Sequence, residues 1–330
     1  MRAFVARRLP DVVLEPLRAV ADVAIFAEEE APVPRARLEA EAASADGLLV
    51  LLTDAVDAAL LATAPRLRAV SVMAVGHDNV DVAACTARGI AVCNTPDVLT
   101  ETTADLCFAI LMACARRLPE ARRVIEEGRW AAWAPFFMAG QDVWGATLGI
   151  VGLGRIGTAV ARRARGFGMR ILYASRSAHP LAEAETGARR TDLAALLAES
   201  DFIVLLAPLL AETRHLIGRR ELARMKPTAV LVNAGRGPLV DEDALVDALR
   251  ERRIWGAALD VFEHEPLPPD HPLLGLPNVV AVPHIGSASV ATRTAMARLA
   301  AENLAAALCG GRPKACVNPE VWGAAAAPQT

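Results

Sequence analysis

The chain has 330 residues and a mass of 34.9 kDa, which is long enough for two domains of ordinary size. Its formal net charge of −3 and its pI near 6.1 give no basic footprint for binding nucleic acid. No apolar stretch reaches the roughly 18 residues of a membrane span, and charge follows Met1 too soon for a signal peptide. We therefore expect a globular, cytoplasmic protein with neither a nucleic-acid nor a membrane partner.

The cysteines form no C-x-x-C pair and have no histidines at a spacing suited to zinc. They are Cys85, Cys93, Cys107, Cys114, Cys309 and Cys316. We therefore expect free thiols in a reducing compartment and no metal site.

The first hundred residues alternate short apolar runs with helical patterns. The runs, each bounded by turn or charged residues, predict strands at 3–7, 23–27, 47–52, 69–75 and 90–96. Apolar residues at helical spacing predict helices at 34–45, 57–66 and 79–89. This alternation is typical of a parallel sheet with helices on both faces.

A second alternation begins at Thr147, after a glycine-free pattern at 99–127 that predicts one long connecting helix. Strands are predicted at 148–154, 170–176, 201–208, 228–235, 256–262 and 279–286. A final long helix is predicted at 286–309, returning to the first unit. We therefore expect an α/β protein with two doubly wound parallel-sheet domains. A domain at 99–285 is inserted into a discontinuous one at 1–98 and 286–330, whose tail from residue 320 frays.

Gly152, Gly154 and Gly157 form the pattern G-x-G-x-x-G directly after a predicted strand and at the start of a helical run. In that context, small residues let backbone N–H groups approach a pyrophosphate, whose negative charge the helix N-terminus favours. Gly157 allows the helix to pack closely on the strand. The motif predicts that the inserted domain is a Rossmann-like, dinucleotide-binding domain.

The segment after the next predicted strand lacks the acidic residue that usually holds the ribose 2′-hydroxyl of NAD. Ser175, Arg176 and Ser177 stand there instead. A guanidinium can make charge-assisted hydrogen bonds to a 2′-phosphate. We therefore expect a preference for NADPH, with NADH still usable. The alternative is that Arg176 is an ordinary surface arginine.

Ionisable residues follow the ends of the later predicted strands. Arg236 follows one strand and lies between two glycines. Asp260 and Glu265 follow the next strand, and His284 follows the last. Because ligands of open α/β sheets bind outside the carboxyl ends of the strands, we expect these side chains to form the catalytic site.

Five motifs occur in a fixed order along the chain: "NTPDVLTETTADL", "GIVGLGRIG", "NAGRG", "ALDVFEHEPLP" and "PHIGSAS". In order and spacing they resemble those of the D-isomer-specific 2-hydroxyacid dehydrogenases, over nearly the whole chain. Within that family the sequence is most similar to the glyoxylate/hydroxypyruvate reductases, through "AVGHDNVD", "WAPFF", "GQDVWG" and "YASRS". The resemblance implies an NADPH-preferring reductase that converts small 2-oxo acids to D-2-hydroxy acids by hydride transfer.

The resemblance also implies a role for each catalytic residue. Arg236 would clamp the substrate carboxylate and polarise the 2-oxo group. His284 would donate a proton to the developing alkoxide, and Glu265 would hold the imidazole and favour its charged form. The amides of Val75 and Gly76 would bind the carboxylate from the first domain.

Contacts with the cofactor are implied in the same way. Asp260 would bind the nicotinamide amide of the cofactor, and Thr103 would bind the cofactor on its phosphate side. The amides of Arg155 and Ile156 would bind the pyrophosphate. Further contacts are implied at Ala207, Pro208, Thr213, Asn233, Ala234, His284 and Gly286.

Trp133 matches a tryptophan that, in the reductase branch, reaches across a dimer and closes the partner's substrate pocket. The resemblance therefore implies a homodimer, and the alternative for Trp133 is a buried core aromatic. Leu52 matches an apolar wall of the same pocket. His77 departs from the branch, which more often has Tyr or Gly there, so the polarity of the pocket and the substrate preference stay open.

Two other activities fit the same sequence. One is a related dehydrogenase for a bulkier 2-oxo acid or for phosphoglycerate, although the segments around Leu52 and Val75 lack the added cations that a phosphate would need. The other is a dinucleotide-sensing binding protein, like the corepressors that share this fold. Oxidation of NADPH on addition of glyoxylate would separate an enzyme from such a binding protein.

Overall fold

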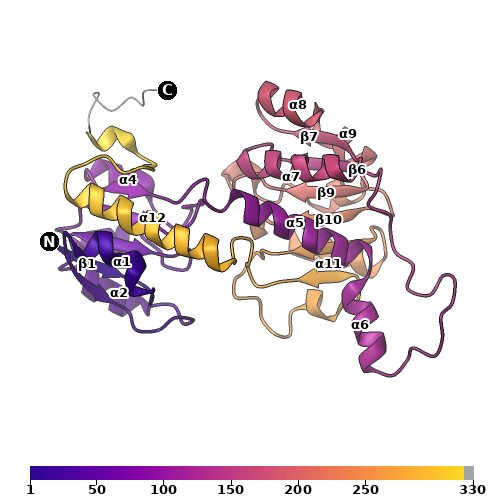
Figure 1. The fold of residues 1–330 in the computed structure, drawn as a ribbon, viewed down its shortest axis with the longest axis horizontal. Helices are drawn as coiled ribbons and strands as arrows, with labels where there is room; N and C mark the ends of the chain where they lie inside the picture. Colours follow the sequence, from indigo (N-terminus) through magenta and orange to yellow (C-terminus); the bar gives the residue numbers. More distant parts are fainter. Residues whose placement is uncertain (323–330) are drawn as a thin grey trace. The chain divides into compact units, whose positions relative to one another are not determined.

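The computed structural model describes residues 1–322, and the chain divides into two compact units. Unit 1 consists of Met1–Leu99 and Ser289–Thr330, and unit 2 of Thr100–Ala288 (Figure 1). The boundaries predicted from the sequence differ from these by one residue at the first junction and three at the second (98 against 99, 285 against 288). The predicted frayed tail falls largely on 323–330, outside the described residues.

Unit 1 is built on a parallel sheet with the strand order β2-β1-β3-β4-β5. Its strands are β1 Arg2–Val5, β2 Asp22–Ile25, β3 Gly47–Val50, β4 Ala69–Val72 and β5 Ala91–Cys93. Helices α2 (Arg35–Ala42), α3 (Ala58–Thr63) and α4 (Val82–Ala87) bury Leu38, Leu60 and Cys85 against one face of the sheet. The expected parallel sheet with its predicted strands is confirmed.

The last long helix, α12 (Val290–Leu308), belongs to unit 1. With α1 (Asp11–Arg18) it lies on the other face of the sheet, where it packs on β3, β4 and β5. The buried Ser71 hydroxyl on β4 donates to the carbonyl of Ala300 at 2.9 Å, which fixes the helix to the strand. The helix therefore returns to the first sheet, as the sequence predicted.

Unit 2 carries a second parallel sheet, in the order β12-β11-β10-β9-β6-β7-β8. The strands are β6 Thr147–Val151, β7 Arg170–Ala174, β8 Arg189–Arg190, β9 Phe202–Leu205, β10 Val230–Asn233, β11 Gly256–Leu259 and β12 Val279–Ala281. The chain runs outward from β6 to β8 and then crosses back to β9 on the other side of β6. The strand order therefore reverses between β6 and β9, where such sheets bind their ligands.

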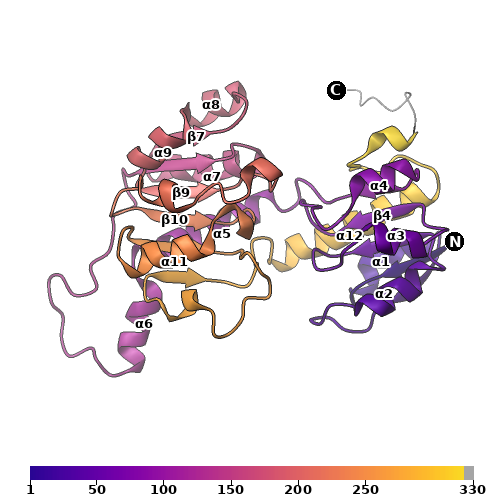
Figure 2. The ribbon, with the colours of Figure 1, turned by 180° about the vertical axis from the view of Figure 1, so that it is seen from behind.

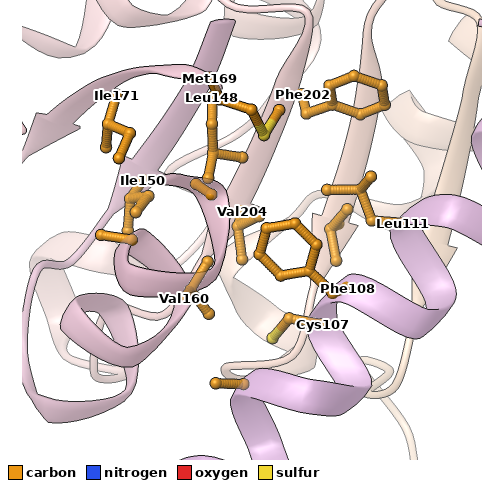
Figure 3. Packing of buried hydrophobic residues seen from close by; sticks show 14 of the residues in the cluster. Cys107, Phe108, Leu111, Leu148, Ile150, Val160, Met169, Ile171, Phe202 and Val204 are labelled. Atoms are coloured by element: carbon orange, nitrogen blue, oxygen red, sulfur yellow. The ribbon is translucent and has the colours of Figure 1, made fainter. Parts of the chain in front are cut away.

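Helices cover both faces of this sheet. Helices α5 (Thr100–Ala115) and α7 (Arg155–Gly166) pack on one face, where Phe108 and Val160 meet the buried side chains of β6 and β9 (Figure 3). Helices α9 (Leu193–Glu199) and α11 (Glu242–Arg250) pack on the opposite face, which Figure 2 shows from the front. Short helices α8 (Pro180–Thr186) and α10 (Arg219–Leu222) lie in the connections. Both sheets are thus doubly wound, as predicted.

The single helix expected over 99–127 is wrong. Helix α5 ends at Ala115 and α6 (Leu118–Glu126) begins after Arg117, whose φ of 55° is left-handed. In a continuous helix, Pro119 would lack a donor and its ring would clash with the carbonyl of Ala115. That carbonyl instead accepts a hydrogen bond from the Gln141 amide at 2.9 Å, so the chain between α6 and β6 is anchored to the end of α5.

Candidate functional site

Every residue predicted to bind the cofactor lies in unit 2, together with the three predicted catalytic residues. Except for those on α5 and α7, they lie at the carboxyl ends of strands in the second sheet or in the loops that follow these ends. Gly152 follows β6, Ser175 follows β7, Arg236 follows β10 and His284 follows β12. Parallel strands end at the same edge, so the fold gathers these side chains at that edge, as the sequence predicted.

The glycine loop joins β6 to α7. Gly152 has a φ of 98°, and a Cβ there would lie 2.7 Å from the nitrogen of Ala207 after β9. Gly157 has no room for a side chain because the carbonyl of Gly152 lies against it. A Cβ at Gly154, the N-cap of α7, would meet nothing within 4 Å. The loop therefore packs tightly at Gly152 and Gly157 but leaves free space at Gly154, the N-terminus of α7. Such space at a helix N-terminus fits a pyrophosphate.

The turn after β7 carries the predicted 2′-phosphate site. The Arg190 guanidinium donates to the carbonyls of Ser175 at 3.0 Å and Arg176 at 2.7 Å, which fixes the course of the turn. The side chain of Arg176 is 79% exposed and forms an ion pair with Glu212 at 3.5 Å. Arg190 and Glu212 were not predicted, because a sequence does not show which distant residues meet a turn.

His284 and Glu265 form the central pair of the site. Nδ1 of His284 lies 2.6 Å from Oε2 of Glu265, and the other carboxylate oxygen accepts from the Phe262 amide at 3.0 Å. Burial alone would raise the pKa of Glu265, but its hydrogen bond to His284 and the charge of that ring outweigh it. The pKa of Glu265 therefore lies below its ordinary value, so the carboxyl group is ionised near neutral pH.

Arg236 lies close enough for its charge to contribute to this lowering of the Glu265 pKa. It follows β10 and is half-buried, and the Asn233 side chain donates to its carbonyl at 2.9 Å. Gly237 lies against the backbone of Phe262, where a Cβ would overlap it. These contacts hold the segment that carries Arg236 next to the segment that carries Glu265.

Asp260 is 1% exposed and supports the turn that carries His284. Its carboxylate accepts from the amides of Ile285 at 2.6 Å and Gly286 at 2.8 Å, and its carbonyl accepts from the His284 amide at 3.0 Å. Burial raises the pKa of Asp260 despite these hydrogen bonds. The structure thus shows a structural use for both carboxylate oxygens, and the contact with a nicotinamide amide stays a prediction.

The remaining predicted cofactor residues also lie near the carboxyl edge of the second sheet. Thr103 on α5 is buried and lies against Gly286. The Thr213 hydroxyl donates to the carbonyl of Pro208 at 2.7 Å, which closes the loop after β9. Asn233 is buried at the end of β10, and its side chain accepts from the Gly235 amide at 3.2 Å.

The predicted substrate residues of unit 1 follow the ends of its own strands. Leu52 follows β3, and Val75 and Gly76 follow β4. Leu52 packs partly against the core of the unit, whereas Val75 is exposed. Within residues 1–322 the amides of Val75 and Gly76 donate to no hydrogen bond, as a pair of anion-binding amides would require.

The segment between α6 and β6, residues 127–146, projects from unit 2 (Figure 1). We call it the arm. Its exposed aromatic side chains are Trp130, Trp133, Phe136, Phe137 and Trp144. Trp133 is 81% exposed, which rules out the alternative that it is a core aromatic of this chain.

A cavity of about 210 Å³ lies at the amino ends of β11 and β12, beside Trp255 and Asn278, and the residues that line it include none of the predicted site residues. In the described part of the chain, His, Cys, Asp and Glu residues form no cluster that could hold a metal ion. Over the same 322 residues no helix is long and apolar enough to cross a membrane.

The comparisons with known proteins agree on one family. The family model of the D-isomer specific 2-hydroxyacid dehydrogenase NAD-binding domain matches residues 108–286. The chain is 52% identical over 321 residues to a glyoxylate reductase of Korarchaeum cryptofilum, covering 97% of this chain and 96% of that protein. It is 49% identical over 316 residues to glyoxylate/hydroxypyruvate reductase B of Escherichia fergusonii, covering 96% and 97%.

One of the similar solved structures is the NADPH-dependent glyoxylate/hydroxypyruvate reductase of Sinorhizobium meliloti in complex with NADP and malonate. It matches this chain with a TM-score of 0.84 at 36% identity, covering 96% of each chain.

Proposed function

The chain belongs to the D-isomer-specific 2-hydroxyacid dehydrogenase family, and we propose that it reduces glyoxylate and hydroxypyruvate with NADPH to the corresponding 2-hydroxy acids, with the D configuration in the hydroxypyruvate product. Its membership makes it an NAD(P)-dependent oxidoreductase acting on the CH–OH group of donors. The substrates are proposed because glyoxylate and hydroxypyruvate reductases are among the relatives that match it over almost their whole length.

The proposed mechanism rests on the hydrogen bond between His284 and Glu265. Because Nδ1 of His284 is engaged by the ionised carboxylate, Nε2 is the nitrogen left to give a proton to the 2-oxo oxygen. Arg236 stabilises the negative charge that develops on that oxygen and binds the substrate carboxylate with its planar fork. When bound, the reduced nicotinamide supplies the hydride.

The substrate proposal is tested by initial rates with NADPH and a panel of 2-oxo acids. Glyoxylate and hydroxypyruvate should give the highest kcat/KM, followed by pyruvate and then phenylpyruvate. A preference for phenylpyruvate or a phosphorylated 2-oxo acid would replace this proposal with the bulkier-substrate activity. Tight NADPH binding without turnover of any of them would indicate a dinucleotide sensor.

The preference for NADPH rests on Arg176 and the turn that presents it. We expect Arg176→Ala to raise KM for NADPH by roughly tenfold, the lower part of the range for a charge-assisted hydrogen bond, because the guanidinium is largely exposed. KM for NADH should stay nearly unchanged. Ser175→Asp should go further and invert the preference, because a carboxylate repels the 2′-phosphate and accepts from an unmodified ribose.

The matched control is Arg170→Ala, which removes an arginine at the opposite end of the same strand, where it pairs with Glu199. It changes the net charge equally and should leave both KM values unchanged. Equal use of both cofactors by the wild-type protein, with no response in Arg176→Ala, would identify Arg176 as an ordinary surface residue.

We also propose that the protein forms a homodimer. Large exposed aromatic side chains on one projecting segment indicate a covered surface, and a two-fold homodimer would bury the arm of each subunit against its partner. We expect sedimentation at micromolar concentration to give a dimer. Trp133→Ala should raise KM for glyoxylate while the melting temperature stays close to the wild-type value. A stable wild-type monomer would rule the dimer out.

A cytoplasmic location is proposed as well. Burial raises the pKa of Cys85 to about 11 and those of Cys107 and Cys114 to about 12. Such thiols stay protonated and unreactive, which suits a reducing compartment.

A further inference from the structure

The segment that carries Val75 and Gly76 is fixed by side chains of the neighbouring segments. We call residues 74–79, which follow β4, the amide loop. On one side, Asn94 directly follows β5, and its side chain donates to the Val75 carbonyl at 2.8 Å. The next residue, Thr95, donates its amide to the carbonyl of Ala74 at 2.8 Å. The amide loop is therefore bonded to the end of β5 at two consecutive residues.

The Asn94 contact determines the direction of one peptide group. The bond between Val75 and Gly76 is trans, so the Val75 carbonyl and the Gly76 N–H point in opposite directions. When Asn94 holds that carbonyl, the Gly76 N–H is turned away from β5. Since this N–H has no partner within the described residues, the geometry presents it to a ligand.

Asn94 is itself supported from behind. Its carbonyl accepts a hydrogen bond from the side chain of Asn303 on α12 at 3.0 Å, and Asn303 is fully buried. Asn94, which holds the Val75 carbonyl, is therefore itself held by a side chain in the core of unit 1.

On its other side, the amide loop is fixed by Asn79. The side-chain amide of Asn79 donates to the carbonyls of Leu51 at 2.9 Å and Asp54 at 2.8 Å. Its own carbonyl accepts from the Val56 amide at 2.8 Å. Asn79 thus joins the amide loop at three points to the segment 51–56, which contains Leu52.

We propose that Asn94 and Asn79 are positioning residues for substrate: Asn94 aims the Val75–Gly76 peptide at the carboxylate, and Asn79 fixes the distance between that peptide and the Leu52 wall. The inference rests on the proposed function, since it takes Val75 and Gly76 as the carboxylate-binding amides. Neither asparagine touches the reacting atoms, so each acts through the loop that it holds. Preorganised donors bind an anion without first having to be ordered.

The test uses the variant Asn94→Ala. The Asn94 side chain is partly exposed, so its removal should leave the core of unit 1 intact. We expect KM for glyoxylate to rise roughly three- to tenfold, the scale of one ordinary hydrogen bond, with kcat and KM for NADPH nearly unchanged. Asn79→Ala should raise KM for glyoxylate as well and should also change the ratio of the KM values for glyoxylate and hydroxypyruvate. Asn94→Gln, which keeps the amide, should recover part of the loss.

The matched control is Asn318→Ala in the same unit. Asn318 is buried, donates to the Thr86 hydroxyl at 2.8 Å and the Ile90 carbonyl at 2.9 Å, and accepts from the Val92 amide at 2.7 Å. Its loss should lower the melting temperature at least as much as that of Asn94 without changing KM for glyoxylate. An unchanged KM for glyoxylate in Asn94→Ala, or an equal rise of the glyoxylate and hydroxypyruvate KM values in Asn79→Ala, would overturn the inference while wild-type turnover upholds the proposed function.

Absence of turnover by the wild-type protein with every 2-oxo acid would instead overturn the proposed function. The inference is then decided by calorimetric binding of oxamate, an unreactive 2-oxo acid analogue. Weaker binding to Asn94→Ala than to Asn318→Ala supports it, and equal binding to the two variants, or no binding to the wild type, contradicts it.

Discussion

Replacing His284 by alanine should lower kcat for glyoxylate reduction by roughly a hundredfold to ten-thousandfold, the usual contribution of a positioned general acid. The imidazole is held by Glu265 at 2.6 Å and by a backbone turn that Asp260 supports, so the substitution removes a proton donor whose position is fixed. KM for NADPH should change far less than kcat, because the glycine loop and the turn after β7 are untouched and His284 is only one of the expected cofactor contacts. Stopped-flow measurement of NADPH oxidation under single-turnover conditions would separate the loss of chemistry from any change in product release.

His271 offers a matched control for this variant, since it is a second histidine beside a carboxylate, with Nε2 lying 3.5 Å from Glu242. His271→Ala should leave turnover nearly unchanged. In addition, Glu265→Gln should lower kcat for glyoxylate reduction, because a neutral amide forms a weaker hydrogen bond to Nδ1 of His284 than the carboxylate does. A His284→Ala enzyme within a few fold of wild type, or a wild-type kcat in Glu265→Gln, would exclude the proton relay.

Replacing Arg236 by glutamine should lower kcat/KM for glyoxylate by roughly a hundredfold to a thousandfold, the range for removing one preorganised donor to a developing oxyanion. Two effects add at this position, because the guanidinium is proposed to bind the carboxylate and to polarise the 2-oxo group. Arg236→Lys should recover only part of the loss, since a point charge cannot reproduce the two parallel donors of a guanidinium. Steady-state kinetics over a range of glyoxylate concentrations would measure both variants.

Arg253 is the control for this position. It precedes β11 at the opposite end of the sheet and pairs with Glu251 at 2.7 Å. Arg253→Gln should leave kcat/KM close to the wild-type value. If Arg236→Lys were as active as wild type, the bidentate role would be wrong, and full activity in Arg236→Gln would remove Arg236 from the site altogether.

The sequence predicted the sheets better than the connections. The core strands are short apolar runs bounded by turn residues, so their positions could be read directly. Helix α1 was not predicted, because Pro16 lies within it and proline is unfavourable inside a helix. Strand β8 consists of Arg189 and Arg190 alone, and an exposed edge strand of two arginines has no hydrophobic signal.

The site could be predicted as far as strand ends determine it. The positions of His284, Glu265 and Arg236 at one edge of the sheet could be predicted because each follows an apolar run, whereas their catalytic roles stay predictions. Nothing in the sequence singled out Asn94, Asn79 or Arg190, because what distinguishes them is their hydrogen bonds to carbonyls of other loops. Such bonds depend on how loops meet in space, and neither periodicity nor residue spacing describes that.

The most direct measurement is the ratio of kcat/KM for NADPH to that for NADH, with glyoxylate as the second substrate and wild-type protein. It tests the reaction, the substrate and the turn Ser175–Ser177 in one assay. We expect steady oxidation of both cofactors with a ratio clearly above one that falls as salt is raised, because salt screens the contact between Arg176 and the 2′-phosphate. A ratio of one or less, or no oxidation of either cofactor with glyoxylate, would contradict the proposed function and its cofactor preference.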